Sequence, residues 1–186
     1  MKKVCLLSLF LLSFTCFAQD SLRVEKSIYG FQAGLLGFWG YNEARISDEI
    51  ALRTELGFDV GISQNNFNDE NFFILIPSVR VEPRWYYNLT KRSDKGKNVS
   101  KNSGNFIALN TTWNPDFFFI TNENKDNINV ISTLAIVPKW GIKRTYGSHF
   151  TFETGIGLGY VFYLENYNNE TGTVGLDLHL RLGYTF

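Results

Sequence analysis

The chain has 186 residues, 44% of them hydrophobic, which is enough for one domain and too polar overall for a bundle of membrane helices. Basic and acidic residues number 18 each, so the formal net charge is zero and nothing favours nucleic acid as a partner. Both cysteines, Cys5 and Cys16, lie near the N-terminus, so the rest of the chain has no thiol for catalysis, disulfides or metal binding.

The N-terminus has the pattern of a secretory signal peptide. Lys2 and Lys3 precede a short apolar run that ends in small residues near Ala18. This run is shorter than the ~20 residues that a membrane-spanning helix needs. We therefore predict a signal peptide over residues 1–19, which is cleaved on export, and one domain over residues 20–186.

Alternating apolar and polar residues predict β-strands along the whole of that domain. In chain order the strands are expected at residues 26–33, 38–46, 50–63, 72–89, 107–114, 127–143, 150–164 and 174–186. Several of them exceed typical soluble strands and match the ~9–11 residues that cross a membrane. Polar connections at residues 64–71, 90–103, 116–126, 144–148 and 166–172 separate the later strands.

The first two strands are the least distinct. Residues 28–46 fit either one strand or two, but bacterial single-chain barrels have an even number of strands and both termini in the periplasm. Six strands after residue 49 therefore require two before it, joined by a tight turn near residues 34–37. Pro77, Pro83 and Pro138 fall inside predicted strands, where each removes a ladder hydrogen bond, so we expect bulges or strand ends there.

The C-terminal strand shows most clearly which face is which. Every second residue from Val174 to Phe186 is apolar, whereas Asp177, His179 and Arg181 lie on the opposite face. Most strand glycines share the charged face, where they would make room for long charged side chains in a narrow interior. The charged face is therefore predicted to point inward and the apolar face toward lipid. A soluble lipocalin-like barrel, with the faces reversed, is the alternative.

The inward face is predicted to hold a network of paired charges. Its members are Arg53, Glu55, Asp59, Arg80, Glu82, Arg84, Lys139, Lys143, Glu153, Asp177, His179 and Arg181. These groups should pair because an unpaired charge in the lumen would be costly. A paired lumen is a plug more than a pore, and a wide channel needs about 16 to 18 strands.

Aromatic and charged residues also divide along the barrel. We expect the following aromatic residues at the membrane interfaces: Trp85, Tyr87, Trp113, Trp140, Tyr160 and Tyr184. The predicted periplasmic turn at residues 90–103 is basic, whereas the predicted external loops are mostly acidic. These ends either meet charged partners or are solvated surfaces that keep the barrel from aggregating.

This combination resembles the small outer-membrane β-barrel domain proteins of Gram-negative bacteria. The resemblance covers the whole mature chain and rests on the signal peptide and on residues 81–92, 95–97, 138–144 and 182–186. It implies an all-β fold, an eight-stranded antiparallel up-and-down transmembrane β-barrel surrounded by outer-membrane lipid. It also implies that Leu182, Tyr184 and Phe186 form the signal read by the barrel-assembly machinery. Such barrels serve as adhesins, structural proteins, small channels and occasionally enzymes.

The residues themselves favour a role without catalysis or a cofactor, either structural or in surface interaction with an unknown partner of the external loops. Ser148, His149 and Glu153 are the nearest linear set to a hydrolase site, but neighbours in a strand point to opposite faces. His179 has no nucleophile beside it, and two histidines without a mature cysteine make a transition-metal site improbable. A lipid-modifying envelope enzyme and a minor small-solute channel remain the alternatives.

Overall fold

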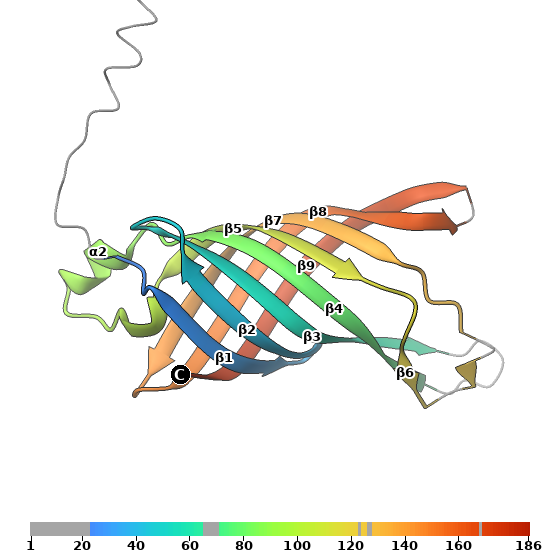
Figure 1. Cartoon of the computed structure of the whole chain (residues 1–186), viewed down its shortest axis with the longest axis horizontal. Coiled ribbons are helices and arrows are strands. Elements are labelled where there is room, and N and C mark those ends of the chain that lie inside the picture. The colour runs from blue at the N-terminus through green and yellow to red at the C-terminus, as the bar shows by residue number, and fades with distance from the viewer. Residues whose placement is uncertain (1–22, 65–70, 123, 126–127, 168) are drawn as a thin grey trace, which may run out of the picture.

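In the computed structural model, the chain forms an antiparallel sheet that closes on itself (Figure 1). The structure describes residues 23–64, 71–122, 124–125, 128–167 and 169–186. The predicted signal peptide over residues 1–19 therefore lies outside the described residues, as does most of the predicted connection at 64–71.

Eight long strands make up the barrel. They are β1 (Ser27–Gly34), β2 (Gly37–Arg45), β3 (Ile50–Gln64), β4 (Asn71–Trp85), β5 (Asn105–Asn114), β7 (Thr133–Tyr146), β8 (Phe150–Tyr167) and β9 (Glu170–Thr185). Each pairs antiparallel with the next long strand along the chain, and β1 pairs with β9 to close the barrel. A short strand, β6 (Ile120–Thr121), pairs with β4 near one end. The predicted eight-stranded up-and-down barrel is confirmed.

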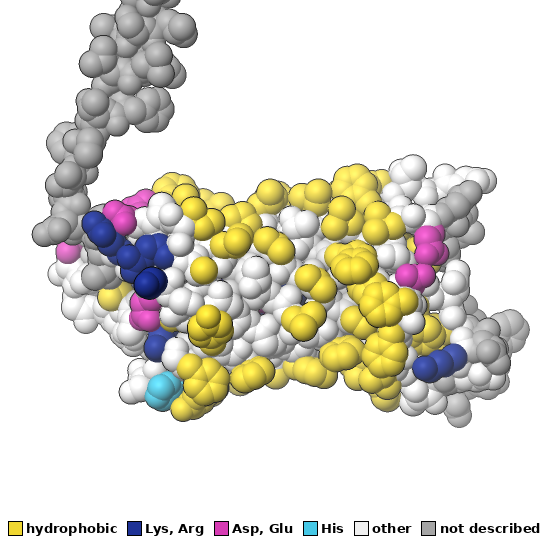
Figure 2. Space-filling model, viewed as in Figure 1, with side chains coloured by type: hydrophobic (Ala, Val, Ile, Leu, Met, Phe, Trp, Pro, Cys, Tyr) yellow, Lys and Arg dark blue, Asp and Glu magenta, His cyan; other side chains and the backbone are white. Residues whose placement is uncertain are grey.

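The two-residue alternation places apolar side chains outside and charged side chains inside. On β9, Leu178 is 51% exposed, whereas the neighbouring His179 is only 8% exposed and Arg181 3%. Figure 2 shows a band of hydrophobic side chains around the middle of the barrel and charged side chains at its two ends. This arrangement is the reverse of a lipocalin-like barrel, whose apolar face lines the interior.

A short helical segment covers one end of the barrel, where a simple turn was expected. It contains the helix α2 (Leu89–Ser93) and the 3-10 helix η1 (Ser100–Asn102), and it lies at the end that also holds the C-terminus (Figure 1). We call residues 86–104 the end cap. Its apolar side chains are buried in a small core inside the barrel end, made of Val24, Ala51, Tyr86, Leu89, Phe106 and Ala108. Within the described residues, no helix is long and apolar enough to span a membrane.

Some strand ends differ from the prediction. The strand expected to run to residue 89 ends at Trp85, because Leu89 is buried in the end-cap core and begins α2. The strand expected from residue 127 begins at Thr133 in the described part of the chain, and residue 127 itself lies outside that part.

The bulges or strand ends expected at the prolines were wrong. Pro77 and Pro83 lie in an unbroken register between β3 and β4. On the other side of β4 the ladder skips residues 82 and 83 and then resumes in the same register. Between β7 and β8 the ladder likewise skips residues 137 and 138 and then resumes in the same register. Each strand continues because its neighbour on the opposite side still holds it.

Candidate functional site

Glu43 on β2 lies at the centre of a network of ion pairs inside the barrel. Its Oε1 atom lies 3.0 Å from Arg53 Nη1, 3.3 Å from Arg84 Nη1 and 3.0 Å from Lys143 Nζ. All four side chains are fully buried. One carboxylate thus joins strands β2, β3, β4 and β7 across the lumen.

Glu153 on β8 is a second buried carboxylate that contacts several cations. Arg84 Nη2 donates to its Oε1 at 2.7 Å, and Arg53 Nη1 lies 3.4 Å from its Oε2. His179 Nε2 lies 3.4 Å from the same Oε1 atom, and His179 Nδ1 lies 3.5 Å from Asp177. The histidine is therefore placed between two carboxylates, as a member of the network.

A third group of charges lies farther from the end cap than Glu43. Glu55 accepts hydrogen bonds from Arg80 Nη1 and Arg181 Nη1, both at 2.9 Å. Arg80 also contacts Asp59 at 3.0 Å with its second terminal nitrogen. Asp59 is partly exposed at the open end, so the network runs from the buried centre of the barrel to solvent.

Glu82 extends the network around the wall. It lies 2.6 Å from Arg84 Nε and 2.6 Å from Lys139 Nζ, and Lys139 lies 3.6 Å from Asp177. The twelve charged residues named from the sequence thus all lie inside the barrel, in one connected set of contacts. Glu43, which sequence reasoning missed, brings the acidic side chains to the same number as the lysines and arginines.

Aromatic rings share the lumen with these charges. The Arg53 guanidinium lies 3.7 Å from the ring centre of Tyr41, and Arg181 lies 4.0 Å from that of Trp39. Such cation–π contacts contribute about 0.5–2 kcal/mol each. Some inward-facing glycines make room for rings as well: an added Cβ at Gly57 would meet Trp39. The expectation that glycines make room for long charged side chains was therefore incomplete.

The end cap is tied directly to the network by Asn102. Its Nδ2 donates to Glu43 Oε2 at 2.9 Å, and its Oδ1 accepts from the backbone N–H of Glu25 at 2.8 Å. The side chain is buried, and the backbone has a positive φ of 56°. One residue therefore joins the N-terminal segment, the cap and the central carboxylate.

Replacing Asn102 with alanine should destabilise the barrel by about 1–3 kcal/mol, because the buried Glu43 carboxylate and the partly buried Glu25 N–H each lose a hydrogen bond. Urea unfolding in lipid vesicles, followed by tryptophan fluorescence, would measure the loss. Glycine at the same position accepts the positive φ and still lacks both hydrogen bonds. If Asn102→Gly were as stable as the wild type, the bridge would contribute nothing.

His149 does not form a catalytic set with Ser148 and Glu153. Its Nδ1 lies 2.8 Å from the backbone carbonyl of Thr185, and its ring stacks on Tyr184 with centroids 4.9 Å apart. Glu153 is buried in the lumen, whereas Ser148 and His149 are exposed at the turn between β7 and β8. His149 thus holds the C-terminal strand in place.

The aromatic residues named for the interfaces lie on the outer surface of the barrel. Trp85, Tyr87 and Trp140 form a group near the end cap, in which Trp140 Nε1 donates to the Tyr87 hydroxyl at 2.9 Å. Tyr184 lies at the same end. Trp113 lies near the end of β5 that is farther from the cap, and Tyr160 lies in the half of β8 that is farther from the cap.

The C-terminus is anchored on β1 and the end cap. The Phe186 backbone N–H donates to the Tyr29 carbonyl at 2.8 Å, and Lys101 Nζ donates to the Phe186 carbonyl at 2.8 Å. The Phe186 ring lies on the outside against Tyr184, with centroids 5.2 Å apart. Leu182 is exposed on the same outer face.

Two acidic residues meet at the end opposite the cap. A hydrogen bond with Asp116 and then the negative charge of Asp116 raise the pKa of the Glu165 carboxyl above its ordinary value of 4.5. An acid with a raised pKa in the folded state favours folding while it is protonated, and this contribution is lost as the pH rises from about 4.5 through the raised pKa.

We expect the contact between the end of β8 and the β5–β6 connection to weaken as the pH rises toward neutrality. Carbon-13 NMR of the Glu165 side chain should show a titration midpoint above 4.5 that falls in the Asp116→Asn variant. A midpoint that does not change in this variant would exclude the contact.

No protein-family model matches the chain, and no curated protein matches it. Among solved structures, the chain is similar to Ail, the attachment invasion locus protein of Yersinia pestis, in its crystal structure with the heparin analogue sucrose octasulfate. The identity is 11% and the TM-score 0.35, over 86% of this chain and 96% of Ail. At this level of similarity, neither the ligand nor the role of Ail carries over to this chain.

Proposed function

We propose that this chain is an integral outer-membrane β-barrel with a plugged lumen and a structural or surface-interaction role. The observation that carries the proposal is the arrangement of the two faces of the barrel. Leucines are exposed on the outer face, whereas the residues beside them in the strands point inward and form buried ion pairs. An exposed apolar band of this extent is rare on a monomeric soluble protein and suits contact with lipid. The pairing of β1 with β9 closes the sheet, as a β-structure that spans a membrane requires.

The ion pairs support a plug more than a pore. The central side chains Arg53, Arg84, Lys143, Glu43 and Glu153 are fully buried in the lumen, between the end cap and the opposite end. A water-filled channel along the axis would have to separate these contacts. Such separation would be costly because each group left behind would be an unpaired buried charge.

The orientation follows from the two ends. The end cap and the C-terminus would face the periplasm, and the β3–β4, β5–β7 and β8–β9 connections would face outward. Export would use the signal peptide over residues 1–19, and the row Leu182, Tyr184 and Phe186 would be read by the barrel-assembly machinery. Trp85, Tyr87, Trp140 and Tyr184 would lie at the periplasmic interface, and Trp113 and Tyr160 at the external one.

The surface role would lie at the charged ends. Lys91, Arg92, Lys95 and Lys97 would present a basic surface to an anionic periplasmic partner. The external connections, which include Asp116 and Glu170, would present an acidic surface to cations or to a basic partner.

Gel migration and membrane extraction test this proposal. A membrane barrel should migrate faster before boiling than after, and it should stay in the membrane pellet after carbonate treatment. A soluble periplasmic product would contradict the proposal. Planar-bilayer recording of the purified barrel should show no discrete conductance steps, and regular steps would favour a channel instead.

A further inference from the structure

The barrel wall has a gap beside the shortest hairpin. Strands β1 and β2 are joined by the tight turn at Leu35 and Leu36, and β1 pairs only with residues 181–185 of β9. Strand β9 begins at Glu170, so a long part of its edge continues past the hairpin. In Figure 1, the β8–β9 hairpin extends well beyond the end of β1. In the described structure, no strand pairs with residues 170–180 of β9 on that side.

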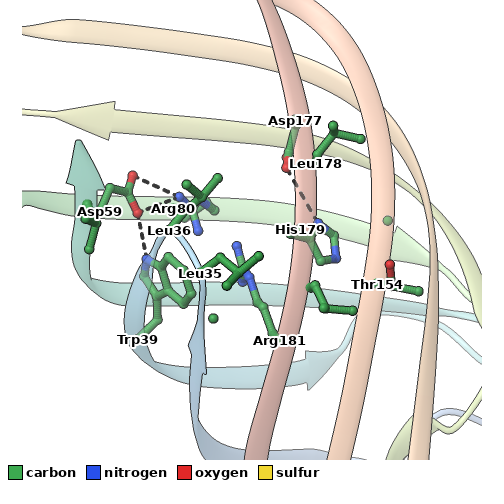
Figure 3. A pocket seen from close by; sticks show the side chains of 14 residues that line it. Leu35, Leu36, Trp39, Asp59, Arg80, Thr154, Asp177, Leu178, His179 and Arg181 are labelled. Atoms are coloured by element: carbon green, nitrogen blue, oxygen red, sulfur yellow. Dashed lines mark hydrogen bonds and ion pairs between the residues drawn. The ribbon is translucent and has the colours of Figure 1, made fainter. Parts of the chain in front are cut away.

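A cavity of about 510 Å³ occupies this gap and joins the outer surface to the lumen. Its outer wall includes Leu35, Leu178 and Leu180, which are exposed on the apolar face. Its inner wall includes Trp39, His179 and Arg181 (Figure 3). One opening thus brings lipid-facing side chains and buried polar groups together.

Arg181 gives this cavity a buried hydrogen-bond donor that has no partner. Arg181 is 3% exposed, and its Nε has no hydrogen-bond partner among the described residues. The acceptor Asp59 is fully engaged, because Trp39 Nε1, Arg80 Nη2 and Asn114 Nδ2 all donate to it at 2.8–3.0 Å. A ligand that completes the hydrogen bonding of Arg181 must therefore supply an acceptor.

The free edge of β9 adds unpaired backbone groups, both N–H donors and C=O acceptors. On this edge, the Phe186 N–H donates to the Tyr29 carbonyl, so every second residue turns its backbone N–H and C=O to the same side. Leu178 belongs to this set and lies past the end of β1. An unpaired backbone group is costly in hydrocarbon, so the gap requires a polar group near Leu178.

An apolar groove adjoins the cavity on the outer surface of β1, β2 and β3. It has a volume of about 650 Å³, and its wall includes Phe31, Phe38, Leu56 and Phe58. Trp39 lines both the groove and the cavity. The apolar groove therefore lies next to the cavity that contains the buried Arg181 donor.

We propose that the gap between the β1–β2 hairpin and β9 binds a long-chain fatty acid from the membrane, with its carboxylate at Arg181 and its chain in the outer apolar groove. A carboxylate can accept from the Arg181 Nε–H, and it is small enough to enter the wall of the barrel. This inference rests on the membrane placement proposed above, and the experiment below tests the two separately.

Fluorescence quenching of Trp39 tests the site. In a protein that keeps only Trp39, with phenylalanine at positions 85, 113 and 140, dibromostearate in phosphatidylcholine vesicles should quench the fluorescence saturably. Arg181→Lys keeps the positive charge beside Glu55 and removes the Nε donor. This variant should bind about tenfold more weakly, because it loses one charge-assisted hydrogen bond.

A variant at the mouth gives a second measurement that leaves the network intact. Thr154 lies on the outer side of β8 and lines the cavity, so Thr154→Phe should weaken quenching by about tenfold by filling the space. Thr54→Phe, on the outer side of β3 nearer the cap, is the matched control and should leave quenching unchanged. Equal quenching in the two variants would overturn the proposal.

The outer tryptophans separate this site from the membrane placement. A protein that keeps only Trp113, which is exposed on the outer face, should be quenched by dibrominated phosphatidylcholine. Absence of that quenching would contradict the membrane placement itself. Quenched Trp113 with unquenched Trp39 would overturn only the fatty-acid site. Quenching of Trp39 by the dibrominated phospholipid alone would also overturn it, by identifying a phospholipid as the occupant.

Discussion

Replacing Glu43 with glutamine is expected to destabilise the folded barrel by about 3–5 kcal/mol, because it leaves buried cations without their shared anion. Nitrogen atoms of Arg53, Arg84 and Lys143 all lie within 3.3 Å of Glu43 Oε1. Glutamine has nearly the same size, so packing is kept and the charge alone is removed. Urea unfolding in lipid vesicles would give the difference in the free energy of unfolding.

Two further variants make this test specific. Glu170→Gln removes a carboxylate that is exposed at the β8–β9 hairpin, so it should change stability by less than about 0.5 kcal/mol. Combining Glu43→Gln with Lys143→Met removes one cation together with the anion and should recover part of the loss. If Glu43→Gln were as stable as Glu170→Gln, the ion-paired lumen would not hold the barrel together.

Introducing arginine at Leu158 should destabilise the barrel by about 2–4 kcal/mol in lipid vesicles, the cost of that charge at the middle of a bilayer. Leu158 lies near the middle of β8 and is 62% exposed on the outer face. In water, an exposed charge at such a position would cost little, so the size of the effect reports on the surroundings of this face. The variant and the wild type would be unfolded with urea from the same vesicles.

The matched control places the same charge outside the apolar band. Phe117 is 77% exposed in the connection between β5 and β6, so Phe117→Arg should change stability by less than about 0.5 kcal/mol. Equal effects at Leu158 and Phe117 would contradict the placement of the band in lipid.

The outer face of the barrel could be predicted from the sequence because lipid imposes one rule on it. Every second residue must be apolar, and β9 obeys this rule from Val174 to Phe186. The inner face follows no such rule, since a ring and a charge can both be buried there. On β2, Trp39 and Tyr41 point inward beside Glu43, so the alternation between polar and apolar residues is lost. For that reason the sequence pattern did not predict Glu43 as the central carboxylate of the network.

The end cap and the gap in the wall depend on contacts between distant parts of the chain. Asn102 contacts Glu43 and Glu25, residues that no local pattern connects with it. The gap arises because β1 is shorter than β9, and the effect of this difference appears only once the two strands are paired. The even strand number of such barrels predicted the hairpin near residues 34–37 but not its consequence for the wall.

The most direct test of whether the barrel lies in lipid with a closed lumen is the broadening of its NMR signals by paramagnetic probes in nanodiscs. A nitroxide on the lipid chains should broaden the methyl signals of Leu176, Leu178, Leu180 and Leu182, and a soluble gadolinium chelate should not. Neither probe should broaden the Nε–H signals of Arg53 and Arg84, which are fully buried in the lumen. Strong broadening of either the arginine or the leucine signals by the soluble chelate would contradict the account.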